Sequence, residues 1–286
     1  MDFSFTPEQE DLRREARAFL EANPSPSMER LAELEWVGIL RSDEFTFLDA
    51  AVLFEELGRV LYDGPFVLNE VAAQPGDETW SIEIDGFVPH LDKVSRVLTP
   101  DMKGGDARGE RLATVDETLG LGLLSRNGTD AADGTWPEVR RRLLAALALE
   151  AVGIGSKVTE LAIAYVSERE QFGKKIGTYQ AISHAVVDAY VAVELARSLA
   201  YWAAWCIAEE DEQAAIAAAA AKAFAAEAAV AACERSIQVH GGIGFTWEHA
   251  LHRFYKRALW LEGFGKRPAE LRAEVAEALL GVTVTA

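Results

Sequence analysis

The stretch that decides the fold is residues 169–177, which read REQFGKKIG and separate the two longest helical patterns of the chain. Apolar residues recur at helical spacing over residues 137–167 before this stretch and over residues 178–209 after it. Gly173 and Gly177 punctuate the connection, and long helices joined by a short connection pack side by side in opposite directions. The sequence therefore predicts an antiparallel helix bundle around this turn.

The same periodicity continues toward the C-terminus, over residues 212–240, 247–261 and 268–280, with glycines between the patterns. Residues 214–230 are small and apolar nearly all round. A helix without a polar face is normally buried, either in its own core or against another chain. We expect residues 137–286 to form a C-terminal helix bundle whose helices provide the surface for assembly.

Upstream of the bundle, residues 65–136 have a different pattern. Apolar and polar residues alternate over residues 80–84, and short apolar runs follow at residues 94–98 and 111–115, with glycines and prolines around them. These features predict a reduced β domain.

The N-terminal segment, residues 1–64, is predicted to be a small helical domain. Thr6 is followed by a proline and by Gln9, a capping-box pattern, so a helix is expected to about Asn23. A second amphipathic pattern covers residues 47–61 and stops at a Gly-Pro pair. The expected fold class is mainly α with a small β domain.

Composition restricts the function. With 286 residues, 50% of them hydrophobic, the chain can bury a sizeable core. Its 46 acidic and 28 basic residues give a net charge of −18, which argues against nucleic acid and anionic membranes as partners. Cys206 and Cys233 have no paired spacing, and neither a leader nor a spanning helix is expected, so we expect a cytoplasmic protein.

Two short motifs carry the candidate chemistry. The first is residues 169–177, and the second is residues 238–246, QVHGGIGFT. Glycines allow the backbone to approach a ligand closely, and an arginine fork can hold a pyrophosphate in a bidentate way. Either motif alone could simply be a turn between two helices.

Together and in this order, the two motifs resemble the signatures of the acyl-CoA dehydrogenase family. The resemblance extends to residues 5–9, FTPEQ, and to residues 54–59, FEELGR, but it covers the middle of the chain poorly. It implies an acyl-CoA dehydrogenase-like fold and FAD bound across a subunit interface. The residues that match the family's grip on the adenine and pyrophosphate are Arg169, Gln171, Phe172, Gln238, Gly241 and Gly242.

The resemblance also implies where a catalytic base should stand, and the chain departs from it there. Gly265 and Leu143 occupy the two positions at which relatives place the catalytic glutamate, and neither side chain can take a proton. Glu262 is three residues short of the first position and remains a weak candidate. Glu150 is about two turns past the second position. For both glutamates a solvated or capping role is the simpler expectation.

The resemblance is strongest to shortened, non-catalytic chains of heterotetrameric relatives in sterol side-chain breakdown. It implies a catalytic partner chain in an α2β2 complex, which would supply the base that acts on an acyl-CoA, here a steroid side-chain thioester. Two alternatives stay open: a self-sufficient homo-oligomeric enzyme with a displaced carboxylate such as Glu262, and a flavin-free scaffold. A metal site at His240, His249 and His252 is not expected, because no cysteine or carboxylate completes the set.

Overall fold

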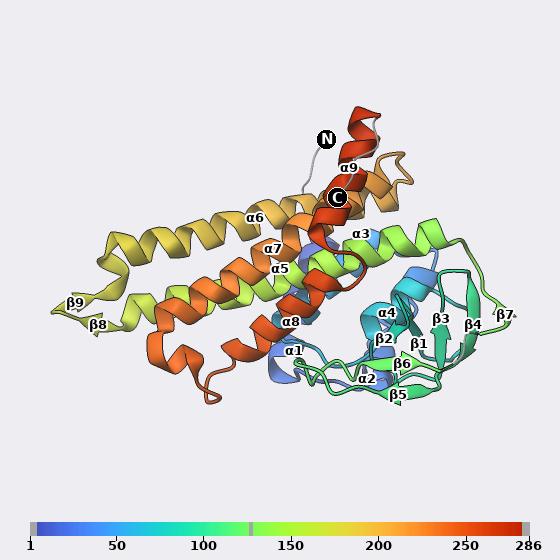
Figure 1. Ribbon diagram of the computed structural model, residues 1–286, viewed down its shortest axis with the longest axis horizontal. Helices are drawn as coiled ribbons and strands as arrows, with labels where there is room; N and C mark the ends of the chain where they lie inside the picture. The colour runs from blue at the N-terminus through green and yellow to red at the C-terminus, as the bar shows by residue number, and fades with distance from the viewer. Residues whose placement is uncertain (1–4, 126–127, 282–286) are drawn as a thin grey trace.

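Helices form most of the molecule, and two small sheets lie at one end of it (Figure 1). The computed structural model describes residues 5–125 and 128–281; residues 1–4, where no leader was expected, lie outside this description. The helices are α1 (Pro7–Ala22), α2 (Met28–Glu33), α3 (Phe47–Arg59), α4 (Phe66–Ala72), α5 (Trp136–Glu168), α6 (Gln180–Ala208), α7 (Ala214–His240), α8 (Leu251–Gly263) and α9 (Pro268–Leu280), with 3-10 turns η1 (Ile39–Arg41), η2 (Ile176–Thr178) and η3 (Gly241–Phe245).

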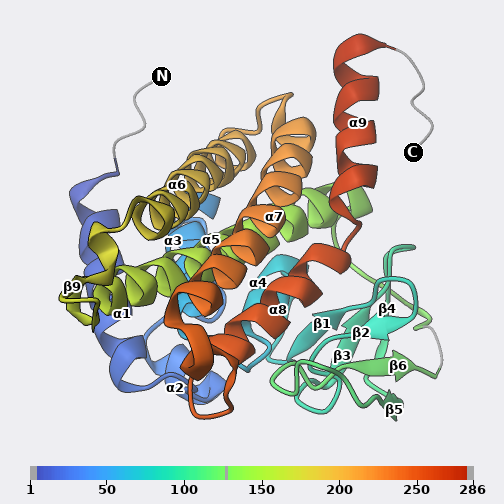
Figure 2. The ribbon, with the colours of Figure 1, turned by 60° about the vertical axis from the view of Figure 1, so that its left-hand side comes forward.

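The bundle is built on α5, α6 and α7, which run alternately up and down (Figures 1 and 2). The predicted bundle is confirmed, and its helix boundaries agree with the expected ones to within about four residues. The predicted capping box is also present, because Thr6 and Gln9 exchange hydrogen bonds of 3.2 Å at the start of α1. Fold class was therefore predicted correctly from periodicity.

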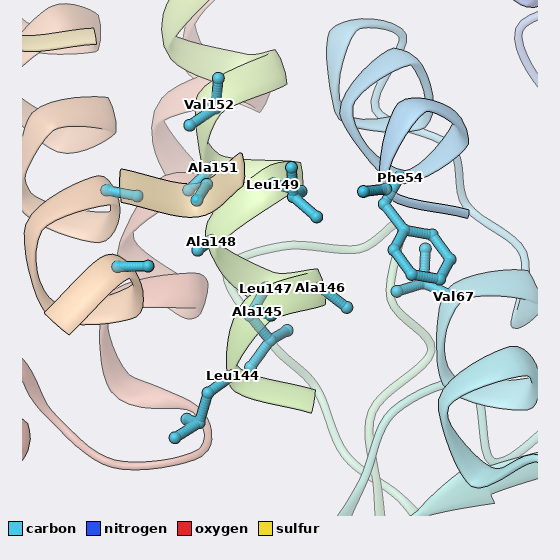
Figure 3. Packing of buried hydrophobic residues seen from close by; sticks show 14 of the residues in the cluster. Phe54, Val67, Leu144, Ala145, Ala146, Leu147, Ala148, Leu149, Ala151 and Val152 are labelled. Carbon is cyan, nitrogen blue, oxygen red and sulfur yellow. The ribbon is translucent and has the colours of Figure 1, made fainter. Parts of the chain in front are cut away.

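Two glycines let α3 and α5 cross in close contact. A Cβ atom at Gly58 would lie 2.3 Å from the carbonyl oxygen of Glu150, and one at Gly153 would lie 2.1 Å from that of Glu55. Around this crossing, side chains of α5 pack between α3 and α4 on one side and α7 on the other (Figure 3). The glycine of the FEELGR motif therefore has a packing role.

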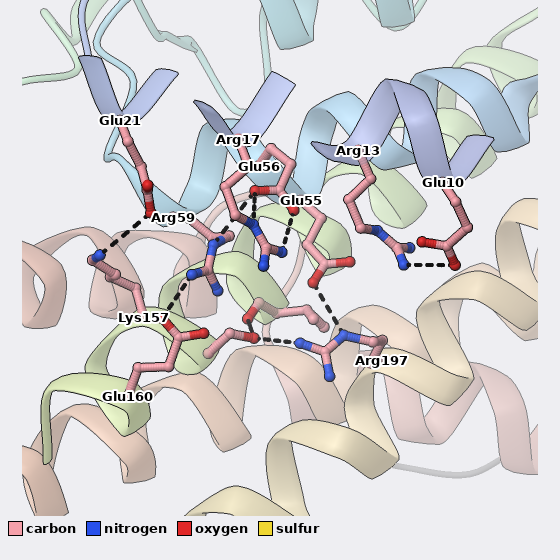
Figure 4. Close-up of polar contacts among 12 residues, drawn as sticks. Glu10, Arg13, Arg17, Glu21, Glu55, Glu56, Arg59, Lys157, Glu160 and Arg197 are labelled. Atoms are coloured by element: carbon pink, nitrogen blue, oxygen red, sulfur yellow. Dashed lines mark hydrogen bonds and ion pairs between the residues drawn. The ribbon is translucent and has the colours of Figure 1, made fainter. Parts of the chain in front are cut away.

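The charged residues of the same motif join four helices through a partly buried network (Figure 4). Glu56 accepts hydrogen bonds from Arg17 at 2.6 and 2.9 Å, and Glu55 accepts from Arg197 at 3.0 Å. Arg59, which is 5% exposed, reaches Glu160 at 2.6 Å. These ion pairs fix the positions of α1, α3, α5 and α6 relative to one another.

The strands form two sheets and one hairpin. The first sheet has the order β1-β3-β4-β7, with β1 parallel to β3, and the second has the order β2-β6-β5. The strands are β1 (Trp80–Ile82), β2 (Phe87–Val88), β3 (Arg96–Leu98), β4 (Lys103–Asp106), β5 (Gly109–Arg111), β6 (Gly122–Leu124), β7 (Asp130–Ala131), β8 (Glu170–Gln171) and β9 (Lys174–Lys175).

Within the segment predicted to be β, three details differ from expectation. Helix α4 was missed, since a short apolar run cannot be assigned to helix or strand by periodicity alone. The strand expected at residues 111–115 ends at Arg111. Ser81, expected on a polar face, is fully buried and donates a 2.6 Å hydrogen bond to the Pro89 carbonyl, because both faces of β1 are covered.

The alanine-rich helix α7 is buried in the chain's own core. Its apolar surface therefore packs within this chain rather than against another one. Of the described bundle helices, α6 carries the most large exposed apolar residues, namely Val187, Tyr190, Val191 and Leu195. By length and composition both helices could cross a membrane, but 67% of the relevant α7 window and 44% of that of α6 are buried inside the protein. Such helices are common in soluble cores, so this is weak evidence for a membrane.

Candidate functional site at the end of the helix bundle

The two sequence motifs lie at the end of the bundle that is farther from the sheets (Figure 1). The first follows α5 and forms the β8–β9 hairpin, and the second follows α7 and forms η3. The rings of Tyr165 and His240 stack with centroids 4.3 Å apart and join the two helix ends. Val239 packs against the small apolar cluster that contains Ile176, so each motif contributes to one shared cluster.

In the first motif the side chains expected to hold a ligand point to solvent. Arg169 is exposed and its guanidinium makes no ion pair or hydrogen bond within the described residues. Gln171 contacts only the neighbouring backbone, donating to the Glu170 carbonyl at 2.7 Å. Phe172 is 93% exposed and has a φ of 53°, a conformation that a bulky residue rarely adopts. Such strain is typical of functional sites, and an exposed aromatic ring offers a surface for a flat ligand or a partner.

The glycines of the second motif lie in two different environments, one open and one tightly packed. A Cβ atom on Gly241 or Gly242 would meet nothing within 4 Å, whereas one on Gly244 would lie 2.6 Å from the Ile237 carbonyl oxygen. Gly244 is therefore needed for packing. Gly241 has a φ of 63° and, with Gly242, leaves open backbone at the helix end. Gln238 is exposed beside them. A ligand can approach this backbone more closely than it could approach any residue with a side chain.

Positive charge gathers at the same end of an otherwise acidic chain. Among the described arginines, four make no salt bridge or side-chain hydrogen bond: Arg142, Arg169, Arg235 and Arg253. Three of the four lie in or next to the two motifs; only Arg142 lies near the sheets. Lys174 of the hairpin adds further charge, whereas Lys175 is paired with Glu170 at 3.0 Å. The open glycine backbone and the unpaired guanidinium groups fit the pyrophosphate of a dinucleotide such as FAD, which carries two negative charges.

The two positions at which the family resemblance places a base converge in space, and neither carries an acid. A Cβ atom at Gly265 would lie 3.2 Å from Leu147 Cδ1 and 3.7 Å from Leu144 Cδ2. Leu143, on the same stretch of α5, is 1% exposed. The partly exposed Glu262 lies near the end of α8, and the backbone carbonyl of Glu262 accepts a 2.9 Å hydrogen bond from the buried Lys222.

Glu150 is not the solvated or capping carboxylate that the sequence suggested, because it is buried in an ion cluster centred on Arg257. Arg257 is 2% exposed and contacts Glu150 Oε1 at 2.5 Å and Asp116 Oδ2 at 2.6 Å. It also donates to Thr118 Oγ1 at 2.5 Å and to the Tyr62 carbonyl at 3.3 Å. This one side chain connects α8, α5, the segment after α3 and a loop between the strands of the second sheet.

The two carboxylates of this cluster respond differently to Arg257. Burial disfavours ionisation of Asp116, but the charge of Arg257 and hydrogen bonds from Thr118 outweigh it and lower the pKa of Asp116. Burial of Glu150 is the larger effect and raises its pKa despite the same arginine. We conclude that Asp116 is the firmly ionised partner of Arg257, since it accepts additional hydrogen bonds that Glu150 lacks.

The cluster leaves almost no free space. The adjoining cavity measures about 20 Å³, roughly the room for one water molecule, and its lining includes Arg257, Glu150, His90 and Leu147. Burial lowers the pKa of His90 to about 3, and His90 Nδ1 has no partner among the described residues. Because Leu147 also touches Gly265, this cavity lies directly behind the expected base position. A cavity of this size has no room for an acyl chain, but Gly265 also lines an open groove of about 330 Å³ with Trp260 and Phe264.

Sequence reasoning missed Arg257, although a signal was present. Arg257 falls on the same helical face as Phe254, Ala258 and Leu261, all of which are buried. A charged residue on a buried face predicts a buried partner. The partner Asp116 is 141 positions away in the chain, and helical spacing gives no information about such a contact.

The histidines near the second motif form a ring cluster. His240 Nδ1 contacts the Ser236 carbonyl at 2.7 Å, and the rings of His240 and His249 lie 4.7 Å apart. No group of three or more metal-ligating side chains occurs in the described part of the chain.

Comparisons with known proteins agree with this architecture. The family model for the acyl-CoA dehydrogenase C-terminal domain matches residues 141–277. The chain is similar to acyl-CoA dehydrogenase IpdE2 of Mycobacterium tuberculosis, with 31% identity over 232 residues, which is 73% of this chain and 71% of the relative. The corresponding protein of Mycolicibacterium smegmatis is 32% identical over 234 residues, covering 73% of this chain and 72% of the relative.

Solved structures share the fold at low sequence identity. The structure of the ChsE4-ChsE5 complex from Mycobacterium tuberculosis superposes with a TM-score of 0.84 at 20% identity, covering 99% of this chain and 100% of the matched one. A steroid ACAD structure, Tcur3481-Tcur3483, gives a TM-score of 0.79 at 20% identity, with 96% and 98% covered. The expected similarity of fold is thereby confirmed.

Proposed function

Because the chain belongs to the acyl-CoA dehydrogenase family, we propose that it is a subunit that holds the adenine and pyrophosphate side of an FAD site completed by a catalytic partner chain. The complex would oxidise an acyl-CoA thioester between its α and β carbons. The proposal covers four points: the cofactor, the part of the active site that each chain supplies, the partner and the substrate class.

The observation that carries the proposal is the distance between the motifs and the sheets. The sheets lie near the start of α5, and the motifs lie at its end (Figure 1). Helix α5 has 33 residues, which corresponds to a length of about 50 Å. A ligand bound at the motifs is therefore far from the sheets of the same chain. Any sheet that covers its other end must come from a second chain.

The arrangement of this chain's own groups also supports a division of labour. Leu143 and Gly265 supply no base, and the buried cavity beside Arg257 holds no more than about one water molecule. A group that abstracts the α-proton must lie within hydrogen-bond reach of it and have a suitable pKa. We infer that the partner chain supplies this carboxylate and the substrate pocket.

Each residue at the bundle end has a definite role in the proposal. Arg169 would bind the pyrophosphate, and Gly241 and Gly242 would let it approach the backbone. Gln171 and Gln238 would donate hydrogen bonds to the adenosine half, and Phe172 would contact the flat ring system. When bound, FAD supplies the acceptor for the hydride that leaves the substrate.

The substrate class is proposed from the relatives. One matched structure is described as a steroid ACAD, so a steroid-derived CoA thioester is the first substrate to test. We further propose that the complex contains two copies of each chain. We also propose that it is located in the reducing cytoplasm. The name of the ChsE4-ChsE5 complex supports a partner of a different sequence.

Co-expression with an acyl-CoA dehydrogenase homologue encoded nearby tests the proposal. We expect the two chains to co-purify with FAD in fewer copies than chains, and the complex to oxidise a steroid-CoA thioester. One flavin per chain in a preparation of this chain alone would favour the self-sufficient enzyme with a displaced carboxylate. A colourless complex without turnover would favour the flavin-free scaffold.

A further inference from the structure

The second motif begins at the C-terminal end of α7, where an anion would meet the negative end of a helix dipole. The last backbone carbonyls of a helix together carry about half a negative charge. Because His240 is the last residue of α7 and Gly241 follows it directly, a pyrophosphate held at Gly241 and Gly242 would lie close to these carbonyls. A positive charge on the imidazole of His240 would offset the repulsion.

The ring of His240 is fixed in position by several contacts. The residue is 4% exposed, and its Nδ1 atom lies 2.7 Å from the carbonyl oxygen of Ser236. The ring of Tyr165 on α5 stacks on it with centroids 4.3 Å apart, and the ring of His249 lies 4.7 Å away. These contacts hold the two ring nitrogens in fixed places.

The hydrogen bonds decide which of these nitrogens can gain a proton. A carbonyl oxygen only accepts, so Nδ1 of His240 donates the hydrogen bond to Ser236. Its Nε2 makes no hydrogen bond within the described residues and keeps a free lone pair. In His249, by contrast, Nδ1 accepts the backbone N–H of Leu251 at 3.3 Å. A second proton on His249 would break that bond, whereas a second proton on His240 would break none.

The surroundings of His240 favour a neutral ring in the free chain. Burial is the main cause and lowers the pKa of His240 below its ordinary value of 6.5; the neighbouring His249 lowers it further, while the Ser236 carbonyl acts against both. The ring of Tyr165 completes these surroundings, and no carboxylate of the described chain contacts the imidazole. An anion at the adjoining backbone would raise this pKa, because an opposite charge within about 4–6 Å favours the charged form.

We propose that His240 takes up a proton from solvent at Nε2 when a pyrophosphate binds beside Gly241 and Gly242, and that cofactor binding is thereby coupled to pH. The proton returns to solvent when the anion leaves, so no covalent bond to the cofactor forms or breaks. His240 is a positioning residue, because it holds the turn that presents the glycine backbone and supplies charge beside it. The inference rests on the proposed function, in which the anion is the pyrophosphate of FAD.

Titration of the apo-complex with FAD at several pH values tests the inference. The added affinity should be fully present below the pKa that His240 has without FAD, and lost as the pH rises through the higher pKa that it has with FAD bound. A pKa increase of about one unit corresponds to about a tenfold change in affinity. The dissociation constant, measured by flavin fluorescence, should therefore increase about tenfold between about pH 5.5 and about pH 8. Calorimetry in two buffers with different heats of ionisation should show proton uptake on binding.

Two variants separate the proton from the packing. His240→Asn keeps an N–H group that can reach the Ser236 carbonyl, and His240→Phe keeps a ring that can stack on Tyr165, but neither side chain can be protonated. Both variant complexes should bind FAD with the weaker affinity that the wild type shows at high pH, and this affinity should not change across the same pH range. His252→Asn is the matched control, because the His252 ring lies against Trp247 at 4.6 Å. This control should keep the wild-type pH profile.

Three results would overturn the inference while the complex still binds FAD, and they would leave the proposed function standing. The first is an affinity of the wild-type complex for FAD that does not change with pH. The second is a pH dependence that both His240 variants retain, and the third is one that His252→Asn abolishes and His240→Asn does not. A wild-type complex that binds no FAD at any pH would refute the proposed function together with the inference.

Discussion

At the scale of single residues, the chain uses arginine in two opposite environments. Arg257 is enclosed by two carboxylates, a hydroxyl and a carbonyl, whereas Arg169 stands in solvent with no partner in the described structure. A buried charge without partners would be costly, so the first arrangement stabilises the fold. An exposed and unpaired guanidinium contributes little to stability and remains available to an external anion.

For Arg169→Ala we expect weaker FAD binding by the assembled complex without loss of assembly. Removing a charge-assisted contact should cost about 1.5–3 kcal/mol, which is a tenfold to hundredfold rise in the dissociation constant. Flavin fluorescence during titration of the apo-complex measures it. Arg108→Ala, an exposed arginine in the sheets, is the matched control and should bind FAD like the wild type. Equal affinities of the two variant complexes for FAD would show that Arg169 does not bind the cofactor.

For Arg257→Met we expect a large loss of stability, because Asp116 and Glu150 would remain buried without their cation. Breaking such a cluster typically costs about 3–5 kcal/mol, measured by urea denaturation. The stranded carboxylates would have raised pKa values in the folded variant, so the variant takes up protons on folding. The difference in the free energy of unfolding between the wild type and this variant should therefore become smaller as the pH falls.

The matched control for this change is Arg272→Met, which removes an exposed ion pair to Glu227 and should cost less than about 1 kcal/mol. A similar loss in both variants would mean that the Arg257 cluster is not a major source of stability. The partners of Arg257 in this cluster could not be predicted from the sequence, because helical spacing gives no information about contacts so far apart in the chain. The residues expected to bind FAD follow from the resemblance to the family and stay a prediction, while the structure places both motifs at one end of the bundle.

At the scale of secondary-structure elements, helix ends and helix crossings decide the architecture. Periodicity predicted the long helices because each buries a face against the core over many turns. It missed α2 and α4, which have six and seven residues, since so few turns give no clear period. It also could not place the exposed apolar surface on α6 rather than α7, because composition does not reveal which neighbours cover a helix.

For Gly153→Ala we expect destabilisation even though alanine favours helices. The methyl group would lie 2.1 Å from the Glu55 carbonyl oxygen, and a backbone atom cannot move aside cheaply. Overpacking of about 1–3 kcal/mol should exceed a propensity gain of about 1 kcal/mol. In Gly263→Ala the added atom would meet nothing within 4 Å, so thermal denaturation should show equal or greater stability. A stabilised Gly153→Ala would contradict the close crossing of α3 and α5.

We expect the contribution of Lys222 to the free energy of unfolding to depend on pH. This side chain lies on α7 and is 1% exposed, and its ammonium group donates to the carbonyl of Glu262 in the last turn of α8 and to that of Lys266 just after it. Burial lowers its pKa to about 8 from an ordinary value of 10.5. The unfolded chain therefore binds more protons than the folded one between these two pH values, and the wild type should gain stability relative to Lys222→Met as the pH rises through them. A stability difference independent of pH from 7 to 10.5 would show that the ammonium is not perturbed.

At the scale of the whole molecule, the chain combines a well-packed interior with several open surfaces. The motif end offers unpaired cations and bare backbone, and the outer face of α6 offers an apolar strip. Gly265, where the family resemblance expects a base, lies against two leucines of α5 and lines an open groove of about 330 Å³ with Trp260 and Phe264, but it carries no acid. Such a chain is suited to hold and assemble rather than to carry out the reaction alone.

We therefore expect no acyl-CoA dehydrogenation above background from the isolated chain with added FAD and an artificial electron acceptor. The chain combined with a catalytic partner should show turnover in the same assay. Glu262→Gln in that complex should leave the rate unchanged, because its carboxylate lies three positions before Gly265 in the chain. Robust turnover by the isolated chain that Glu262→Gln abolishes would establish the displaced-carboxylate alternative.

The length of α5 has one more consequence, which concerns the kinds of mutation that the chain can tolerate. Every residue added to or removed from a helix turns its far end by about 100° and shifts it by about 1.5 Å. A single-residue deletion in the middle of α5 would therefore point the hairpin and Arg169 in a new direction, while the sheets stayed in place. Lineages descended from this chain should accumulate substitutions freely along the solvent side of α5, yet keep its residue count fixed.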